Sequence, residues 1–329
     1  MFFFKNKITQ NIKNALIFIF DFLIIPFTIL ASLLLKLIRK YIVTFWGKKA
    51  PFSLLIFQKI GVFPIIDHFY EPYFFTNKQN IKYKFKNSFP GIDLNTKEQL
   101  ELINNFNFND EIIQISKLPN SKFNYSFNKG PFLSGDADIL YCMIRYFKPN
   151  KIIEIGCGYS SLMIQHGLIK NQQENNIDFN HVCIEPYLAE WVSELNVEFV
   201  KEKVEDIDIK YFETLKNGDI LFIDSSHMIR PRGDVLFEYL EILPILKPGV
   251  IVHIHDIFYP NDYPDQWTKS GILFWNEQYL LEAFLTLNKE FKIICATNFL
   301  KNNYYNELSN VAPMLKSDRE PGSFWIQRI

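Results

Sequence analysis

The chain has few cysteines and almost no net charge, and each shortage excludes a class of protein. Its 329 residues include four cysteines and no C-x-x-C motif. We therefore expect reduced, packed thiols rather than a disulfide framework or a cysteine metal site. The 35 lysine and arginine side chains nearly balance 36 aspartates and glutamates, which leaves a net charge of −1. Without a general basic surface the chain has no broad attraction for phosphate backbones, so we expect no nucleic-acid partner.

Internal repeats and signs of disorder are also lacking. Hydrophobic residues make up 48% of the chain and charged residues 22%, which excludes wholesale disorder and coiled-coil designs. The length allows one large domain or two smaller ones. We expect a globular chain with a sizeable core.

A long apolar run lies near the N-terminus, from Ala15 to Leu35. It covers 21 residues and is interrupted only by Asp21, Pro26, Thr28 and Ser32. As a helix it would be roughly 31 Å long, which matches the bilayer core. Each Leu, Ile or Phe favours insertion by about 0.3 to 0.6 kcal/mol, whereas one Asp costs about 2.5 to 3.5 kcal/mol. A membrane-spanning anchor is predicted, because a cleavable signal peptide has a shorter apolar core and a small-residue cleavage site.

Basic residues flank this run, and more of them follow it than precede it. The positive-inside rule then places the following domain in the cytoplasm. Two alternatives stay open: attachment to one face of the membrane, with a kink at Pro26 and Asp21 turned toward water, and a buried helix of a soluble core. In both membrane cases the N-terminal segment contacts lipid. The basic residues are Lys5, Lys7 and Lys13 before the run and Lys36, Arg39, Lys40, Lys48 and Lys49 after it.

Three segments are predicted along the chain. Residues 1–50 form the membrane anchor and a basic juxtamembrane segment, residues 51–129 an irregular cap, and residues 130–329 the main domain. Within the cap, one helix is predicted near Thr96 to Asn105. The apolar patch from Pro51 to Ile66 is too short to span a bilayer.

Short apolar runs alternate with helix-compatible segments in the main domain. Strands that are apolar throughout and alternate with helices are typical of a parallel sheet covered on both faces. The predicted fold class is therefore α/β, with a doubly wound, mostly parallel sheet. The predicted strands are Lys151–Ile155, His181–Ile184, Val197–Val200, Ile220–Ile223 and Val250–Ile254. The predicted helices are one that starts at Ser134, then Ser161–Lys170, Leu188–Leu195 and Asp234–Leu246.

The first of these strands runs into a glycine-rich turn and then a helix. The turn reads E-I-G-C-G-Y-S-S from Glu154 to Ser161. Gly156 and Gly158 permit a tight turn and the close approach of a ligand, and the helix start offers unpaired N–H groups. Ser161 occupies the place of the third glycine of a dinucleotide fingerprint, so the glycine pair alone is a weak signal.

Acidic residues follow the next strands and strengthen the weak signal of the glycine pair. Glu185 ends the second strand, where a carboxylate can accept hydrogen bonds from ribose hydroxyls. Val204 and Glu205 follow the third strand, where an adenine could be held. Asp224 ends the fourth strand in the sequence I-D-S-S-H, which closes at His227. Ligands of open α/β sheets bind at such strand ends, so these residues predict a nucleotide-like ligand.

In order and spacing these motifs resemble the class I S-adenosylmethionine (SAM)-dependent methyltransferases. The resemblance covers roughly residues 130–329 and includes the run L-K-P-G-V-I-V-H-I-H-D from Leu246 to Asp256. It implies a seven-stranded sheet ending in an antiparallel hairpin, predicted at Phe291–Ala296 and Ser323–Gln327. It also implies SAM as cofactor. The implied contacts are Glu154, Gly156, Gly158 and Ser160 near the methionine part, Glu185 at the ribose, Val204 and Glu205 at the adenine, and Asp224 beside them.

Four residues at the strand ends are candidates for catalysis, namely Asp224, His227, His255 and Asp256. Methyl transfer needs an in-line nucleophile, usually with a base that takes its proton. Since the pKa of histidine suits proton abstraction near neutral pH, His227 is a candidate base. Its alternative role is to position the loop after the fourth strand by hydrogen bonding. His253, deeper in the fifth strand, is predicted to be a core residue.

A divalent cation is a further question raised by the resemblance. Related sugar and catechol O-methyltransferases bind such an ion with acidic residues at comparable strand ends, and Asp224 and Asp256 match these positions. His255 stands where a second adjacent carboxylate is often found, and magnesium prefers oxygen ligands. The sequence leaves a magnesium site at Asp224 and Asp256 as an open alternative.

The sequence thus predicts a membrane-attached SAM-dependent methyltransferase with its catalytic domain in the cytoplasm. Its acceptor would be an oxygen or nitrogen of a small molecule, a glycan or a lipid-linked compound. Two alternatives are an NAD(P)-binding oxidoreductase, because the strand–glycine–helix turn also suits that cofactor, and a non-catalytic module with the same fold.

Overall fold

The chain forms two compact units, Met1–Ile81 and Lys82–Ile329. The computed structural model describes residues 2–44, 51–66, 89–119, 121, 123–127, 130–187, 191–268 and 273–329. The predicted boundary at residue 50 thus differs from the division of the structure. Residues 67–88 of the predicted cap, and Lys48 and Lys49 of the basic segment, lie outside the described residues.

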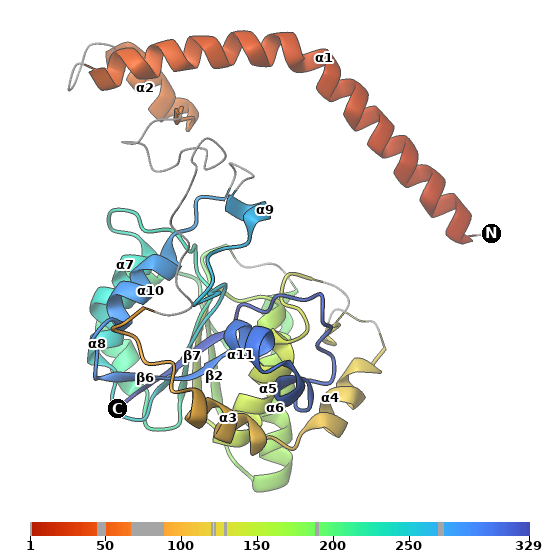
Figure 1. The fold of residues 1–329 in the computed structure, drawn as a ribbon, viewed down its shortest axis with the longest axis vertical. Helices are drawn as coiled ribbons and strands as arrows, with labels where there is room; N and C mark the ends of the chain where they lie inside the picture. The colour runs from red at the N-terminus through yellow and green to blue at the C-terminus, as the bar shows by residue number, and fades with distance from the viewer. Residues whose placement is uncertain are drawn as a thin grey trace. The chain divides into compact units, whose positions relative to one another are not determined.

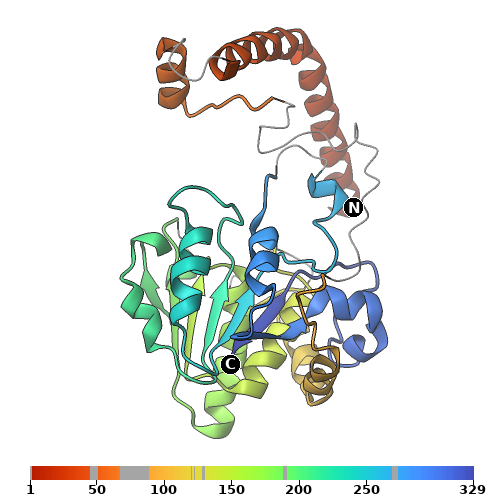
Figure 2. The ribbon, with the colours of Figure 1, turned by 60° about the vertical axis from the view of Figure 1, so that its left-hand side comes forward.

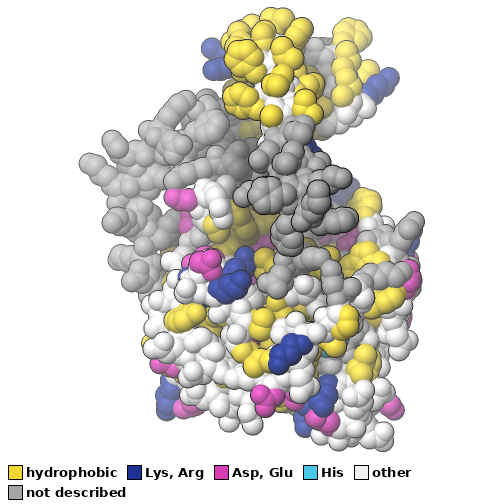
Figure 3. Space-filling model, turned by 90° about the vertical axis from the view of Figure 1, so that its right-hand side faces the viewer, with side chains coloured by type: hydrophobic (Ala, Val, Ile, Leu, Met, Phe, Trp, Pro, Cys, Tyr) yellow, Lys and Arg dark blue, Asp and Glu magenta, His cyan; other side chains and the backbone are white. Residues whose placement is uncertain are grey.

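The N-terminal unit contains two apolar helices, α1 (Phe2–Thr44) and α2 (Pro51–Ile60). The predicted apolar run lies inside α1, which bends between two straight arms (Figure 1) and contains Pro26, a residue without a backbone N–H. The stretch Lys13–Lys40 is long and apolar enough to cross a membrane, and its most apolar part is not buried. Hydrophobic side chains cover most of the face of these helices that is seen in Figure 3. A core helix of a soluble protein would bury such side chains.

The second unit is built around a seven-stranded sheet with the order β3-β2-β1-β4-β5-β7-β6. Strands β1 to β5 are parallel, and β7 lies between β5 and β6, antiparallel to both. The predicted doubly wound sheet with a late antiparallel hairpin is therefore confirmed. The strands are β1 (Lys151–Ile155), β2 (Asn180–Ile184), β3 (Glu198–Val200), β4 (Ile220–Ile223), β5 (Ile251–Ile254), β6 (Phe291–Ala296) and β7 (Phe324–Arg328).

Helices cover both faces of this sheet (Figures 1 and 2). On one face, α5 (Asp136–Phe147) packs against α6 (Tyr159–Asn175). On the other lie α10 (Glu277–Leu285) and a continuous helix made of α7 (Asp234–Phe237), a π-helical turn (Glu238–Ile242) and α8 (Leu243–Ile245). The remaining α-helices of the described residues are α3 (Thr96–Asn104), α4 (Asn109–Ser116), α9 (Asp265–Thr268), α11 (Thr297–Asn303) and α12 (Tyr305–Ser309). Helical turns of the 3-10 type lie at Val192–Glu194, Val204–Asp206 and Ile209–Thr214.

Two helix predictions need correction. The helix predicted from Ser134 begins at Asp136, because the Asp138 carboxylate accepts the backbone N–H of Gly135 at 2.8 Å and so caps the helix two residues later. Of the helix predicted at Leu188–Leu195, residues 188–190 lie outside the described residues, and the rest forms only a 3-10 turn. Leu195 is already extended there, since the chain must enter β3 at Glu198.

Two helices of the predicted cap, α3 and α4, pack into the core of the domain that carries the sheet. Ile103 of α3 and Ile112 of α4 are fully buried in the same hydrophobic core as the sheet. Gln99 of α3 is fully buried too, and its side-chain oxygen accepts the backbone N–H of Ala296 at 2.7 Å. The described residues from Phe89 onward therefore belong to the domain that carries the sheet.

Candidate active site

The sheet brings the ends of β1 and β4 into unusually close contact. The two strands are neighbours, and the backbone N–H of Asp224 donates to the carbonyl of Ile155 at 2.9 Å. Gly156 has a φ of +83°, and a Cβ added to it would lie 1.8 Å from the carbonyl oxygen of Asp224. Only glycine fits this position. A Cβ added to Gly158, in contrast, would meet no atom within 4 Å, so this glycine borders open space.

Glu154 lies beneath the glycine turn and holds it in place. Its carboxylate is fully buried and accepts the hydroxyls of Ser160 at 2.6 Å and Ser161 at 2.7 Å. The Ser161 hydroxyl also accepts the backbone N–H of Gly158 at 3.1 Å. Ser161 therefore braces the turn in which a third glycine is absent. The structure places Glu154 behind the cavities that the turn borders, where it supports the turn from below.

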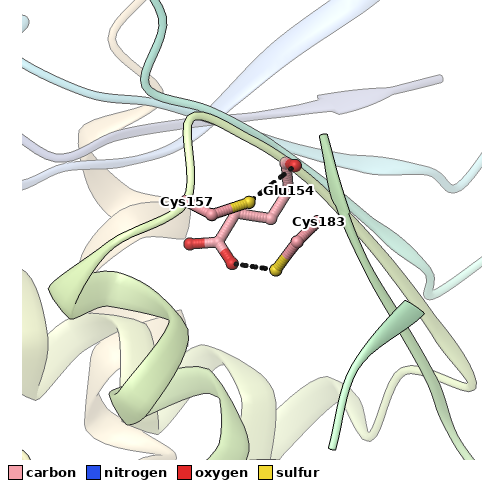
Figure 4. Close-up of side chains that lie close together, drawn as sticks. All are labelled: Glu154, Cys157 and Cys183. Carbon is pink, nitrogen blue, oxygen red and sulfur yellow. Dashed lines mark hydrogen bonds between the residues drawn. The ribbon is translucent and has the colours of Figure 1, made fainter. Parts of the chain in front are cut away.

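Two cysteines join Glu154 in a cluster whose carboxylate oxygen and sulfur atoms lie within 4.8 Å of one another (Figure 4). Glu154 and Cys183 are buried, and Cys157 is half-buried. The Cys183 thiol donates to a Glu154 carboxylate oxygen at 3.4 Å, and the Cys157 thiol donates to the Glu154 backbone carbonyl at 3.7 Å. Burial raises the pKa of the Cys157 thiol far above its ordinary value, which disfavours the thiolate that a metal would need. The imidazole Nε2 of His181 also lies 2.8 Å from the carboxylate. We interpret the cluster as hydrogen-bonded support for the turn.

Two adjoining cavities open at the carboxyl ends of the strands. The first has a volume of about 630 Å³ and the second about 430 Å³. Gly156, Glu185 and Asp224 line both cavities. Among the other predicted residues, the first cavity is lined by Val204 and Glu205, and the second by Gly158, Ser160, His227, His255 and Asp256.

Aromatic side chains form much of the outer wall of the second cavity. Trp267 lies in α9 and Trp275 precedes α10, and their ring centroids are 5.0 Å apart at a steep angle. Trp275 also packs against the ring of His227 at 4.5 Å. Trp267 and Trp275 therefore contribute directly to the cavity wall.

His227 lies between three carboxylates. Its Nδ1 is 2.8 Å from Glu277 Oε2, and its Nε2 is 3.2 Å from Asp224 Oδ1 and 3.7 Å from Asp256 Oδ2. Burial alone would lower the pKa of His227, but hydrogen bonds and charge from Asp224 and Glu277 raise it well above its ordinary value. Because each nitrogen faces a carboxylate oxygen, each must carry a proton. The ring then has no lone pair with which to accept a proton, so the predicted role of His227 as general base does not fit this geometry.

The other candidate residues differ in how they are held. Burial tends to raise the pKa of Asp224, but the nearby His255 and His227 outweigh it and hold that pKa below its ordinary value. Asp256 has a left-handed backbone with a φ of +56°, and its Oδ1 lies 3.8 Å from Nε2 of His255. His253 is fully buried and stacks on Phe222 at 4.0 Å, which confirms its prediction as a core residue.

Glu277 is the residue that sequence reasoning missed. It is fully buried, and besides His227 it accepts the hydroxyl of Tyr239 at 3.1 Å. An acidic residue in the first turn of a helix ordinarily indicates favourable helix-dipole placement on the surface. The one available signal was its place close after a tryptophan, in the sequence Trp275-Asn276-Glu277.

Most of the strands and loops that form the two cavities match a known protein family. Residues 153–257 match the family model described as "Methyltransferase domain". That match spans the glycine turn, Glu185, Asp224 and His227, and ends just after Asp256. Residues 153–257 thus carry the sequence pattern of a methyltransferase domain. The predicted class I SAM-dependent methyltransferase domain is thereby confirmed, and its seven-stranded sheet with a late antiparallel hairpin is the one that the resemblance implied.

Other similar proteins add no more specific activity to this methyltransferase domain. An uncharacterized protein of Archaeoglobus fulgidus is 32% identical over 137 residues, which cover 40% of this chain and 61% of that protein. An O-methyltransferase from Bacillus cereus, solved in complex with SAH, has a TM-score of 0.40 at 14% identity and covers 69% of this chain and all of that one. A putative methyltransferase from Thermobifida fusca has a TM-score of 0.36 at 10% identity, and the alignment covers 73% of this chain and 83% of that one.

Proposed function

We propose that this chain is a membrane-attached methyltransferase that uses SAM to methylate an oxygen or nitrogen of a small-molecule, glycan or lipid-linked acceptor. The observation that carries the proposal is the pair of adjoining cavities, which share Gly156, Glu185 and Asp224 at the point where the strand order reverses. The first cavity can take the nucleoside of SAM, and the second can take its methionine end together with an acceptor. Both volumes lie in the range of small-molecule sites.

The residues present suit SAM in shape and in chemistry. Gly158 leaves open space beside the turn, and the carboxylate of Glu185 reaches both cavities, where ribose hydroxyls would donate to it. Val204 is buried and offers adenine an apolar wall. When bound, SAM supplies a methyl group on a positively charged sulfur.

The acidic residues between the cavities would orient the acceptor. Asp224 is held ionised, so it accepts a hydrogen bond from an acceptor hydroxyl or amine. Because both nitrogens of His227 are engaged with carboxylates, we assign the acceptor proton to one of the two aspartates that line the second cavity, Asp224 or Asp256. Proximity and alignment would supply much of the rate enhancement. The tryptophan wall would limit water at the reacting atoms.

Binding of SAM by the full-length protein in detergent tests the cofactor assignment by calorimetry. We expect micromolar-range affinity in the wild type and a loss of tenfold or more in Glu185→Ala. Glu202→Ala is the matched control, since Glu202 is exposed and lines neither cavity. The proposal fails if the wild type does not bind SAM, and the site assignment fails if Glu185→Ala binds as the wild type does.

Transfer of labelled methyl groups from SAM into membrane and soluble extracts tests the activity and finds the acceptor. The expected result is a labelled product that Asp224→Asn reduces by at least a hundredfold while SAM binding persists. SAM binding without any labelled product would instead support the non-catalytic alternative.

Membrane attachment is supported by α1, whose apolar side chains are exposed along a stretch long enough to cross a membrane. The full-length chain should stay in the membrane pellet after alkaline carbonate extraction. The double variant Leu23→Asp and Leu30→Asp should move to the supernatant, because each charge opposes insertion by a few kcal/mol. Leu240→Asp, a charge added at an exposed position of α7–α8, is the control and should remain in the pellet. Release of the wild type would contradict the proposal.

A further inference from the structure

The imidazole of His227 occupies the space where the divalent cation of the related enzymes would have to lie. The open alternative was a magnesium ion held by Asp224 and Asp256. Nε2 of His227 lies 3.2 Å from the nearer oxygen of Asp224 and 3.7 Å from that of Asp256. An ion shared by these two carboxylates needs oxygen contacts of about 2.0 to 2.1 Å for magnesium. The ring edge already lies between the two carboxylates, so these residues do not fit the ion as they are arranged.

The ring is fixed in this place from several sides. Glu277, fully buried, engages Nδ1 at 2.8 Å, and Trp275 packs against the ring at 4.5 Å. The backbone carbonyl of His227 accepts the N–H groups of Asn276 at 3.0 Å and Glu277 at 3.2 Å. The segment that carries Glu277 is thus bound to the loop that carries His227. Swinging the ring away would remove the positively charged partner of the buried Glu277 carboxylate, which is costly.

The balance of charge at this point supports the same role. Asp224 and Asp256 line one cavity side by side, and two close carboxylates repel each other unless a positive group lies between them. A ring that donates from both nitrogens supplies one positive charge and two directed hydrogen bonds. Among the described residues, the set grouped tightly enough to hold a metal is Glu154, Cys157 and Cys183, which lies under the glycine turn.

We propose that His227, held in place by Glu277, is the built-in cation of this site and excludes a divalent ion from the space between Asp224 and Asp256. Glu277 then acts as a positioning residue, fifty positions away in sequence from the ring that it holds. One consequence rests on the proposed function: if this site transfers methyl groups, the transfer needs no divalent cation.

Manganese binding by the full-length protein in detergent, followed by electron paramagnetic resonance, tests this directly. We expect the wild type to bind Mn²⁺ at least tenfold more weakly than His227→Asn, in which the ring is gone and an amide oxygen replaces it. Adding Asp256→Asn to His227→Asn should abolish the gain. His166→Asn, on α6 and outside both cavities, is the matched control and should bind as the wild type does. Tight Mn²⁺ binding by the wild type that Asp224→Asn or Asp256→Asn removes would overturn the proposal.

A measurement on the wild type alone covers the case in which His227→Asn does not fold. In protein with ¹⁵N-labelled histidines, the signals of His227 should show protons on both ring nitrogens and should not broaden selectively when Mn²⁺ is added. Selective broadening of His227 and His255 would place the ion beside them and refute the inference. Failure of SAM to bind would refute the proposed function but leave this result standing, so the two failures can be told apart.

Discussion

At the scale of single residues, a comparison of two glycines distinguishes the cost of a left-handed backbone from the cost of a steric collision. Gly156 and Gly218 have nearly the same φ, +83° and +87°, but an added Cβ would lie 1.8 Å from a backbone oxygen at Gly156 and no closer than 3.9 Å to any atom at Gly218. A left-handed backbone costs a residue with a side chain roughly 1 to 2 kcal/mol. The collision at Gly156 adds to this cost, because the adjacent strands β1 and β4 must separate to relieve it.

We therefore expect Gly156→Ala to lower the thermal unfolding midpoint by roughly 5 °C or more, and Gly218→Ala by only about 2 to 4 °C. Thermal melts followed by circular dichroism would measure both. Equal shifts would show that the strands yield without cost and would contradict the close contact between β1 and Asp224.

The buried pair of Glu154 and His181 makes stability depend on pH. Burial would lower the pKa of His181, but interactions with Cys183 and with the Glu154 carboxylate raise it to about 10. Since this value lies above the unfolded value of about 6.5, the pair adds stability that is complete below pH 6.5 and is lost as the pH rises toward 10. Glu154→Gln removes one partner charge.

We expect Glu154→Gln to lower the free energy of unfolding at pH 6.5 by a few kcal/mol and to flatten its decline between pH 6.5 and 10. Urea unfolding at several pH values would measure this, with the exposed Glu202→Gln as control. An unchanged slope in Glu154→Gln would show that the pair does not set the pH dependence.

At the scale of elements, the parallel strands were predictable and several helices were not. Strands β1 and β4 have the predicted bounds because a strand buried on both faces is apolar throughout, a pattern that a single sequence displays. Helix α4 was missed because Asn and Phe residues around it obscure the apolar period, although Ile112 and Ile115 lie on one buried face. Glu277 was missed for a different reason, since its partner His227 is near it only in the folded chain.

Helix α3 gives a test of whether the segment before residue 130 belongs to the domain. We expect Gln99→Ala to cost about 2 to 3 kcal/mol, because it leaves the buried N–H of Ala296 without its partner. Chemical unfolding would measure this against Lys97→Ala on the same helix. Lys97 pairs with Glu101 at 3.7 Å, and both side chains are exposed (83% and 63%), so its loss should cost less than about 0.5 kcal/mol. A Gln99→Ala variant as stable as the control would mean that α3 is only loosely attached.

At the scale of the whole molecule, the excess of basic residues after the apolar run predicts the orientation of the chain. The side of α1 that carries Lys36, Arg39 and Lys40 should face the cytoplasm. In sealed membrane vesicles with the outer face exposed, protease should leave the methyltransferase domain intact until the vesicles are permeabilised. Digestion before permeabilisation would show the opposite orientation.

The position of β7 has a consequence for biogenesis. In this sheet β6 reaches β5 only through β7, which follows both of them in the chain. The sheet therefore cannot close during translation until β7 has been made, whereas α1 precedes every strand and, as a helix, pairs its backbone groups within itself. If α1 inserts as proposed, each nascent chain is tethered to the bilayer while its sheet is still open. Delivery to the membrane would then come before enzymatic competence, and a chain stalled ahead of β7 would be an inactive protein already in its final location.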